Sequence, residues 1–341
     1  MRYRPLGRTG LQVSELGFGC GAVGGILVRG EQRTAVRVVE RAIELGINYF
    51  DTARIYGNGA SETNLGLALS ELGADVLVGT KVQLAPAEME NIPKAIAESV
   101  EGSLRRLGRE YVDLIQLHNA IGLYRQPERR WVGVADLEPV VQAFEALQKQ
   151  GKARFWGING LGETEALHQA IACSGAHTIQ VCYNLLNPTA GMKAPPRFPF
   201  QDYRQLIDRA ASMQMGVIAI RVLAGGALSG TAERHPVAVD VVSPIASGRN
   251  YLEDVERAKR FSLLVEGGYV SNLVEAALRF AISKAEISTA LVGFSDREQL
   301  EQAVAYVQKG PLPAEALRRC ERIWADFAES DGLEHQLSSQ D

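Results

Sequence analysis

Eight short apolar segments recur along the chain, and an amphipathic segment separates each from the next. They are four or five residues long and rich in β-branched residues, which favours buried strands over helices. The expected strands cover 16–19, 47–50, 76–80, 112–116, 153–157, 178–182, 216–220 and 288–292. Strict alternation of strands with helices is typical of a parallel (β/α)8 barrel. The sequence therefore predicts this α/β class, a TIM barrel preceded by a β-hairpin over residues 2–15.

Helices are expected between these strands, where apolar positions recur at helical spacing. They cover 32–45, 61–72, 91–107, 136–150, 163–173, 201–214 and 270–283, with extra helices near 252–264, 296–308 and 313–328. Ser61 is placed to begin one helix, and four glycines are placed to end others: Gly46, Gly73, Gly108 and Gly151. We expect a single domain over residues 1–330 and a polar C-terminal tail over residues 331–341.

Composition excludes several classes of partner. The formal net charge of the 341 residues is −4 and no basic stripe is present, so nucleic acid is not expected to bind. No apolar run approaches the roughly 20 residues that span a bilayer, and the charged N-terminus does not resemble a signal peptide. Four scattered cysteines fit thiols in a reducing cytoplasm, and they show no metal-binding or redox spacing.

Four side chains suited to proton transfer lie at the carboxyl ends of neighbouring strands. Asp51 ends the strand 47–50, Tyr56 follows in a glycine-flanked loop, Lys81 follows 76–80, and His118 follows the run Val112–Leu117. The carboxyl ends of parallel strands meet at one rim of a barrel, so these groups should lie together. Singly, each has an ordinary explanation as a helix cap, a rim aromatic, a surface lysine or a core histidine. Their joint placement favours a shared function.

The expected chemistry is interconversion of a carbonyl group and an alcohol. A free phenol has a pKa of roughly 10, and an ammonium held beside Tyr56 would lower it. Asp51 would hold Lys81 in place, and His118 would orient a carbonyl oxygen against Tyr56. Protons alone cannot reduce a carbonyl, so a hydride carrier is also required.

A Rossmann fold is a competing interpretation, because Gly19–Gly24 matches G-x-G-x-x-G after a strand and Asp51 ends the next strand. In that fold the helix begins within the glycine motif, whereas here the residues GILVRGEQ intervene. The barrel is therefore favoured.

The sequence resembles the aldo-keto reductase superfamily along nearly its whole length. The motifs that carry the resemblance are, in order, LGRTGLQVSELGFG, GINYFDTARIYG, GTKV, DLIQLHN, GKARFWGING, QVCYNLLN, LAGGALSG and LVGFSDREQLEQ. The resemblance implies a (β/α)8 barrel that reduces aldehydes or ketones with NADPH. It also implies Tyr56 as general acid, Lys81 and Asp51 as the pair that tunes it, and His118 as the group that orients the carbonyl.

The resemblance further implies a set of cofactor-binding residues: Gly19, Cys20, Gly21 and Asp51 beside the nicotinamide, Asn159 and Gln180 at its carboxamide, Arg221, Leu223, Gly225 and Arg249 near the diphosphate, and Gly293, Ser295, Gln299 and Gln302 near the adenosine phosphate. The chain departs from the family pattern at three points. Asn159-Gly160 stands in place of Ser-Asn, Arg221 stands in place of serine, and Gln302-Ala303 stands in place of Glu-Asn. NADP is expected, with Ser295 and Arg297 available for its 2′-phosphate, and NAD remains open.

The substrate is expected to be a small-molecule carbonyl compound, with Phe18, Tyr124 and Trp131 as apolar walls of its pocket. Sugar aldehydes or lactols, aromatic aldehydes, α-keto aldehydes and pyridoxal all stay open, as does the oligomeric state. Two other functions compete with the reductase. One is a nucleotide-binding regulatory or channel-associated subunit with little turnover. The other is a lyase or aldolase in which Lys81 forms a Schiff base, which Asp51 disfavours by keeping the amine protonated.

Overall fold

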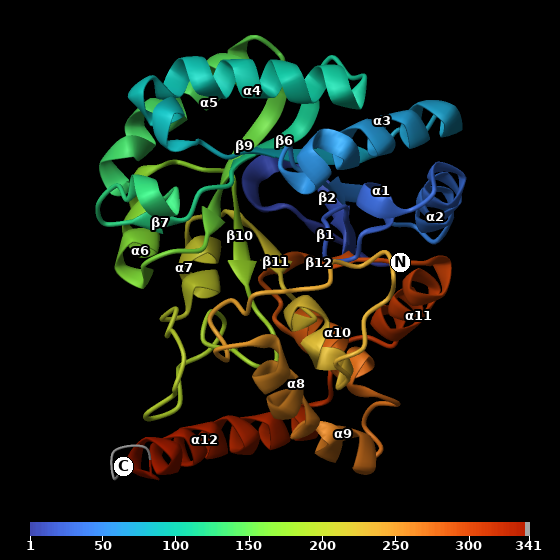
Figure 1. Cartoon of the computed structure of the whole chain (residues 1–341), viewed down its shortest axis with the longest axis vertical. Helices are drawn as coiled ribbons and strands as arrows, with labels where there is room; N and C mark the ends of the chain where they lie inside the picture. The colour runs from blue at the N-terminus through green and yellow to red at the C-terminus, as the bar shows by residue number, and fades with distance from the viewer. Residues whose placement is uncertain (338–341) are drawn as a thin grey trace.

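A computed structural model describes residues 1–337, and eight parallel strands close into a barrel at its centre (Figure 1). Around the barrel the strands follow the order β10-β11-β12-β3-β4-β5-β6-β9. Their bounds are β3 (Leu16–Gly19), β4 (Tyr49–Asp51), β5 (Leu77–Val82), β6 (Val112–Leu117), β9 (Ala153–Gly160), β10 (Thr178–Cys182), β11 (Gly216–Ile220) and β12 (Ile287–Gly293). The predicted (β/α)8 barrel is confirmed, and a Rossmann fold is excluded. Asp51 and Lys81 lie within their strands rather than just after them.

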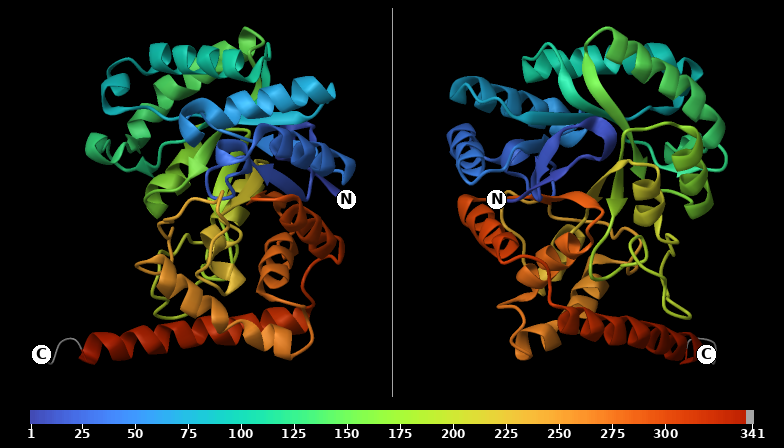
Figure 2. Two further views of the ribbon diagram at one scale, coloured as in Figure 1. Left: turned by 45° about the vertical axis from the view of Figure 1, so that its right-hand side comes forward. Right: turned by 180° about the vertical axis from the view of Figure 1, so that it is seen from behind.

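Helices surround the barrel in an outer layer (Figure 2). The α-helices are α1 (Ile26–Arg29), α2 (Gln32–Glu44), α3 (Ala60–Leu72), α4 (Ile92–Leu107), α5 (Leu137–Lys149), α6 (Thr164–Cys173), α7 (Leu206–Ser212), α8 (Tyr251–Lys259), α9 (Ser262–Glu266), α10 (Leu273–Ser283), α11 (Arg297–Gln308) and α12 (Ala314–Leu337). Short 3-10 helices are η1 (Gly7–Thr9), η2 (Tyr56–Gly59), η3 (Pro86–Glu90), η4 (Pro127–Arg129), η5 (Val134–Asp136) and η6 (Ala224–Ser229). None of the helices within residues 1–337 is long and apolar enough to cross a membrane.

Three predicted helices differ from those observed. The expected helix 201–214 is shortened to α7, because Arg204 and Gln205 adopt left-handed φ angles of 49° and 58°. The expected helix 252–264 is divided into α8 and α9. Helix α12 continues through Leu337, where the sequence predicted a polar tail, and residues 338–341 lie outside the described part of the chain. In Figure 1, α12 lies at the lower end of the molecule, below α8 and beside α9.

Helix ends follow the glycines that the sequence indicated. The four glycines predicted to end helices have φ angles between 58° and 89°, a conformation open to a residue without a Cβ: Gly46, Gly73, Gly108 and Gly151. Ser61 does not begin a helix as predicted, because α3 starts at Ala60 after Gly59. The Ser61 hydroxyl is buried and donates to the Cys20 carbonyl at 2.8 Å, which ties α3 to the loop after β3.

The predicted N-terminal hairpin is confirmed as two antiparallel strands, β1 (Tyr3–Pro5) and β2 (Gln12–Ser14). The hairpin closes the amino end of the barrel, because Leu6 and Val13 belong to the small apolar cluster that fills the barrel interior near that end. The other buried members of this cluster are Tyr49, Leu114, Ile218 and Leu291. A Cβ at Gly7 would lie 2.1 Å from the Gly216 nitrogen, so only glycine allows this close approach.

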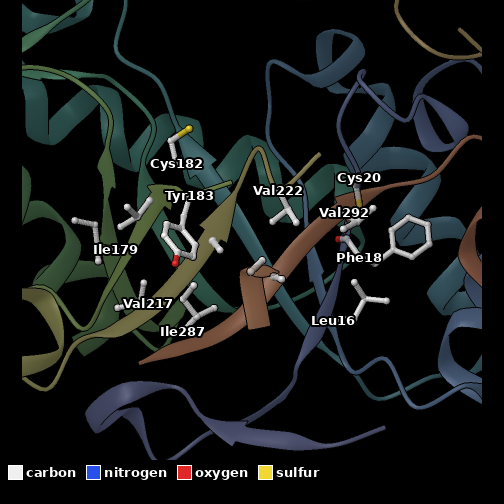
Figure 3. Close-up of a cluster of buried hydrophobic side chains, with 14 of the residues drawn as sticks. Leu16, Phe18, Cys20, Ile179, Cys182, Tyr183, Val217, Val222, Ile287 and Val292 are labelled. Carbon is white, nitrogen blue, oxygen red and sulfur yellow. Dashed lines mark hydrogen bonds between the residues drawn. The ribbon is translucent and has the colours of Figure 1, made fainter. Parts of the chain in front are cut away.

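A larger apolar core fills the space between the barrel wall and the helices (Figure 3). Phe18 belongs to it, with its ring centroid 5.3 Å from that of Phe50 and 5.1 Å from that of Phe294. Because successive residues of a strand face opposite sides, Gly17 and Gly19 face the barrel interior and Phe18 faces the helices. The prediction that Phe18 lines the substrate pocket is therefore wrong.

Arg4 should be the main polar anchor of the hairpin. Its guanidinium donates to the carbonyls of Ile282, Lys284 and Ile287 at 2.9, 3.2 and 2.8 Å. Arg2 and Arg4 both pair with Glu15, so Arg2 provides a matched control. We expect Arg4→Met to lower the free energy of unfolding by about 2–3 kcal/mol, and Arg2→Met by less than about 1 kcal/mol. Urea denaturation measures both, and equal losses would contradict this role.

Candidate active site

The ammonium of Lys81 is the centre of the polar groups at the carboxyl end of the barrel. Both Lys81 and Asp51 are buried, and Lys81 Nζ donates to Asp51 Oδ1. The same nitrogen donates to the Thr52 carbonyl at 2.7 Å and lies 3.2 Å from Tyr56 Oη. These three contacts use all three ammonium donors. Lys81 is thereby held in one orientation, facing the phenol.

The second oxygen of Asp51 is held by two further side chains. Tyr49 Oη donates to Asp51 Oδ2 at 3.1 Å, and Gln180 Nε2 donates to it at 2.7 Å. Tyr49 was not among the residues expected at the site from the sequence. The sequence does place it two residues before Asp51 on the same strand, and residues two apart on a strand face the same side, which could have indicated the contact. The carboxylate is thus fixed from both sides.

The loop after β4 returns Tyr56 over the mouth of the barrel. The Thr52 nitrogen donates to Gly79 O at 2.8 Å, and the Tyr56 nitrogen donates to Ala53 O at 3.0 Å. A Cβ at Gly21 would lie 3.5 Å from the Tyr56 ring, so the loop after β3 also borders this ring. Tyr56 is therefore positioned by the backbones of three neighbouring strands and their loops.

His118 directly follows β6 and packs against Tyr56. The two ring centroids are 5.7 Å apart with an interplanar angle of 85°. The backbone nitrogen of His118 donates to Val82 O at 2.7 Å, and the backbone carbonyl of His118 accepts a hydrogen bond from Asn159 Nδ2 at 2.9 Å. The adjacent Asn119 side chain bonds both the nitrogen and the carbonyl of Leu84. The main chain is therefore fixed on both sides of the imidazole.

The environment keeps Tyr56 protonated at neutral pH. Burial raises the pKa of Tyr56 above its ordinary value, and the charge of Lys81 opposes that shift without reversing it. Lys81 acts in the expected direction, since it lowers the pKa of the phenol, but burial outweighs it and the net shift is upward. Burial lowers the pKa of Lys81, but Asp51 and Tyr56 more than compensate and the net shift is upward. Lys81 is consequently a cation beside a neutral phenol.

The imidazole of His118 is neutral under the same conditions. Burial and the nearby charge of Lys81 lower its pKa to about 3. Its Nδ1 is buried and has no hydrogen-bond partner within the described part of the chain. His118 can therefore orient a ligand oxygen by a hydrogen bond, but it does not act as a cation.

Glycine backbone forms a surface without side chains beside Tyr56. Gly19 pairs with Asp51 on β4 and with Gly293 on β12, and a Cβ at Gly19 would lie 3.2 Å from the backbone of the β12 strand. The Cys20 side chain belongs to the large apolar core, so only its backbone can face this surface. Burial raises the pKa of its thiol. Such a surface lets a flat ring approach closely.

Asn159 and Gln180 are register partners on β9 and β10, and both amides point into the barrel mouth. Asn159 Oδ1 is buried and has no partner among residues 1–337, so it is free to accept an amide hydrogen. A Cβ at Gly160 would lie 2.6 Å from the Gln180 carbonyl. Asparagine at position 160, as in the family pattern, would therefore not fit, and the role of Asn159 toward a carboxamide stays a prediction.

A long segment over residues 231–250, here called the strap, crosses the mouth of the barrel. Arg234 donates to Gly225 O at 2.8 Å, and the Val239 nitrogen donates to Ala22 O at 3.1 Å, so the strap links the loop after β11 to the loop after β3. Arg234 was not among the residues expected at the site from the sequence. The predicted residues Leu223 and Gly225 lie where the strap is attached.

Arg221 also contacts the strap, through a hydrogen bond from Nη1 to Ser243 O at 3.2 Å. Its φ angle is 56°, a left-handed value that a residue with a Cβ seldom adopts. Asn184 Nδ2 donates to the Arg221 carbonyl at 2.9 Å and so supports this conformation. Asn184 belongs to the motif QVCYNLLN, but no local pattern in that motif indicates this contact.

The remaining predicted cofactor residues divide into two groups. Ser295 Oγ donates to Gly24 O at 2.6 Å, and Gln299 Oε1 accepts from the Ser295 nitrogen at 2.9 Å, so both border the β3 loop. Arg249 has 80% of its side chain exposed and pairs with Glu253, and Gln302 bonds Glu298 on the surface of α11. Their roles toward a nucleotide stay predictions.

The expected pocket walls lie on the loop after β6, which carries β7 (Ile121–Gly122) and β8 (Val132–Gly133). Tyr124 is 81% exposed, and the Arg129 guanidinium lies 5.5 Å from the centroid of Trp131. Tyr124 therefore lies on an exposed rim, whereas Trp131 is half-buried beside it, and the role of both toward a substrate stays a prediction.

Residues 15–325 match the family model described as the Aldo/keto reductase family. The chain belongs to the aldo/keto reductase family. An L-galactose dehydrogenase of Arabidopsis thaliana is 29% identical, over 90% of this chain and 88% of that protein. A putative voltage-gated potassium channel subunit beta of Schizosaccharomyces pombe is 30% identical, over 94% and 92%. The structure of an aldo-keto reductase from Bacillus halodurans in its holo form has a TM-score of 0.68 at 26% identity, covering 95% of this chain and 96% of that one.

The neutral state of His118 can be measured by NMR. We expect its imidazole signals to show no protonation between pH 8 and 5, because the folded pKa lies near 3. In the unfolded chain His118 has its ordinary pKa of ~6.5, so as the pH falls the unfolded chain binds the proton before the folded protein does. The contribution of neutral His118 to stability is therefore fully present above pH ~6.5 and is lost as the pH falls toward 3. In Lys81→Met the pKa should rise partway, because burial remains. A normal titration midpoint near pH ~6.5 in the wild type would contradict this account.

Proposed function

We propose that this aldo/keto reductase family member interconverts an aldehyde or ketone with the corresponding alcohol or lactol, using NADP(H). The observation that carries the proposal is the contact of Lys81 with both Asp51 and Tyr56, with His118 edge-on against the same phenol. This arrangement presents one proton and one neutral hydrogen-bonding ring to a carbonyl oxygen at the barrel mouth. Relatives named as oxidoreductases support the same class of chemistry.

Tyr56 is the general acid of the proposed reaction. Its phenol holds a proton at neutral pH and transfers it from Oη to the carbonyl oxygen as that oxygen gains negative charge. The phenolate left behind lies 3.2 Å from Lys81 Nζ, so an ammonium stabilises the charge where it forms. In the reverse direction the phenolate accepts the alcohol proton. His118, which is neutral, orients the oxygen.

NADP(H) fits the residues around Tyr56. Asn159 Oδ1 offers a buried acceptor for a carboxamide, and Gly19, Gly21 and Gly293 leave a flat surface for a ring. Arg221 and the strap would lie along the diphosphate. When bound, the reduced cofactor supplies the hydride. The choice of NADP over NAD rests on the family resemblance, because Arg297 is paired with Glu301 and Asp296 caps α11.

A second candidate is a nucleotide-binding regulatory subunit with little turnover. The similarity to the putative potassium channel subunit beta of Schizosaccharomyces pombe favours it. A Schiff-base lyase is disfavoured, because the pKa of Lys81 is raised and an attacking amine must be unprotonated. Binding of NADPH without turnover of any carbonyl compound would support the regulatory subunit.

Replacement of Tyr56 by phenylalanine should abolish most of the activity. Loss of the proton donor is expected to lower kcat by about 100-fold or more, with NADPH binding nearly unchanged. The measurement is absorbance at 340 nm with NADPH and a panel of sugar, aromatic and α-keto aldehydes. Tyr124→Phe, on the exposed rim, is the matched control and should keep its activity. Equal rates in the wild type and Tyr56→Phe would rule out this mechanism.

Asn159 should contribute to cofactor affinity. Asn159→Ala removes the buried acceptor, so the Kd for NADPH measured by fluorescence titration should rise about 3- to 10-fold. Tyr124→Phe is the control, because Tyr124 is exposed on the rim, and the Kd of this variant should be unchanged. An unchanged Kd in Asn159→Ala would show that the carboxamide binds elsewhere.

A further inference from the structure

Polar side chains, here called the polar layer, lie inside the barrel beside members of its small apolar cluster and toward its amino end from the Lys81–Asp51 pair. Lys81 on β5 pairs in register with Gln116 on β6, Gln116 pairs with Gly157 on β9, and Gly157 pairs with Thr178 on β10. Register partners on adjacent parallel strands are about 4.8 Å apart and point to the same side of the sheet. Because Lys81 points inward, Gln116 and Thr178 also point inward.

Four polar atoms in this layer have no hydrogen-bond partner among the residues that the structure describes. They are Nε2 and Oε1 of Gln116, Oγ1 of Thr178 and Oγ1 of Thr289. The three residues are at most 1% exposed. Buried polar groups in folded proteins are nearly always satisfied by protein or by ordered water, because an unsatisfied one costs free energy. Protein atoms do not supply these partners.

Glycines provide the space in which these polar atoms lie. A Cβ at Gly157 would lie 2.1 Å from Thr178 Oγ1, and a Cβ at Gly17 would lie 2.9 Å from Thr289 Oγ1. A Cβ at Gly79 would lie 2.4 Å from the phenol oxygen of Tyr49. Barrels of this class usually fill such interior positions with bulky branched side chains. Here the same positions carry hydroxyl groups, an amide and bare backbone.

We propose that Gln116, Thr178 and Thr289 bind a small cluster of buried water molecules inside the barrel, directly beneath Lys81 and Asp51. Water fits this donor set better than a cation does, because the three ligating groups are neutral and include both donors and acceptors. Apolar side chains such as Ile218, the register partner of Thr289, border the site, and the Lys81–Asp51 pair lies toward the carboxyl end of the barrel. The waters are therefore a permanent part of the folded protein.

The cluster gives the buried ion pair a polar neighbour on its inner side. Gln116 lies beside Lys81 in the register, and Tyr49, which donates to Asp51, reaches the same layer over Gly79. A buried charge pair is stable only when polar groups surround it, since its transfer from water is costly. The water cluster is independent of the proposed reaction, and its tests do not use catalysis.

Replacement of threonine by valine preserves side-chain volume and isolates the hydroxyl group. If water is bound, Thr178→Val and Thr289→Val should each lower Tm by about 2 °C, because one water loses a partner. A high-resolution crystal structure of the wild type should show water within about 3.2 Å of the Thr178 hydroxyl, and that water should be absent or displaced in Thr178→Val. If the layer is dry, both valine variants should raise Tm, because they remove an unsatisfied hydroxyl, and this result would overturn the proposal.

Two further arms complete the test. Thr231→Val is the control, because Thr231 is exposed to solvent and lies outside the barrel. Its Tm should not fall. Gln116→Leu should lower Tm by more degrees in the wild type than in a Lys81→Met/Asp51→Asn background, in which the charges are absent. Equal losses, or a direct hydrogen bond between Gln116 and Thr178 in the crystal, would contradict the proposal.

Discussion

The buried ion pair between Lys81 and Asp51 is the interaction on which the rest of this active site depends. An ammonium and a carboxylate taken out of water are stable together only when geometry is close and their remaining hydrogen-bonding positions are filled. Here Thr52, Tyr49 and Gln180 fill those positions, from β10 as well as from the β4 strand and its loop. The pair therefore requires a closed barrel, because strands far apart in the sequence must meet around it.

The catalytic roles proposed for Tyr56 and His118 follow from where this pair lies. Burial keeps Tyr56 protonated and His118 neutral, so the site holds a proton donor and an uncharged orienting group at the same rim. Lys81 supplies its charge where a phenolate would form, at the one oxygen that gives up a proton. Glycine backbone from β3 and β12 leaves the adjacent surface open, so ring-shaped ligands can reach the phenol without displacing a side chain.

The two ends of the barrel serve different purposes. At the amino end, the hairpin seals the interior with Leu6 and Val13, and this end contributes to stability. At the carboxyl end, Asn184, Arg234 and the strap connect loops from several strands. Long connections leave only this end, which agrees with the placement of active sites in barrels of this class.

The sequence by itself determined the barrel, the hairpin, the helix-ending glycines and the four residues that meet at the rim. Each depends on local patterns, such as apolar periodicity, turn residues and strand ends. Tertiary structure alone decided that Phe18 faces the helices, that Gln180 and Tyr49 hold Asp51, and that burial outweighs Lys81 in setting the pKa of Tyr56. These features depend on which strands become neighbours and on how much water the closed barrel excludes. Neither can be read from a single segment of the sequence, because both arise only when the whole barrel has closed.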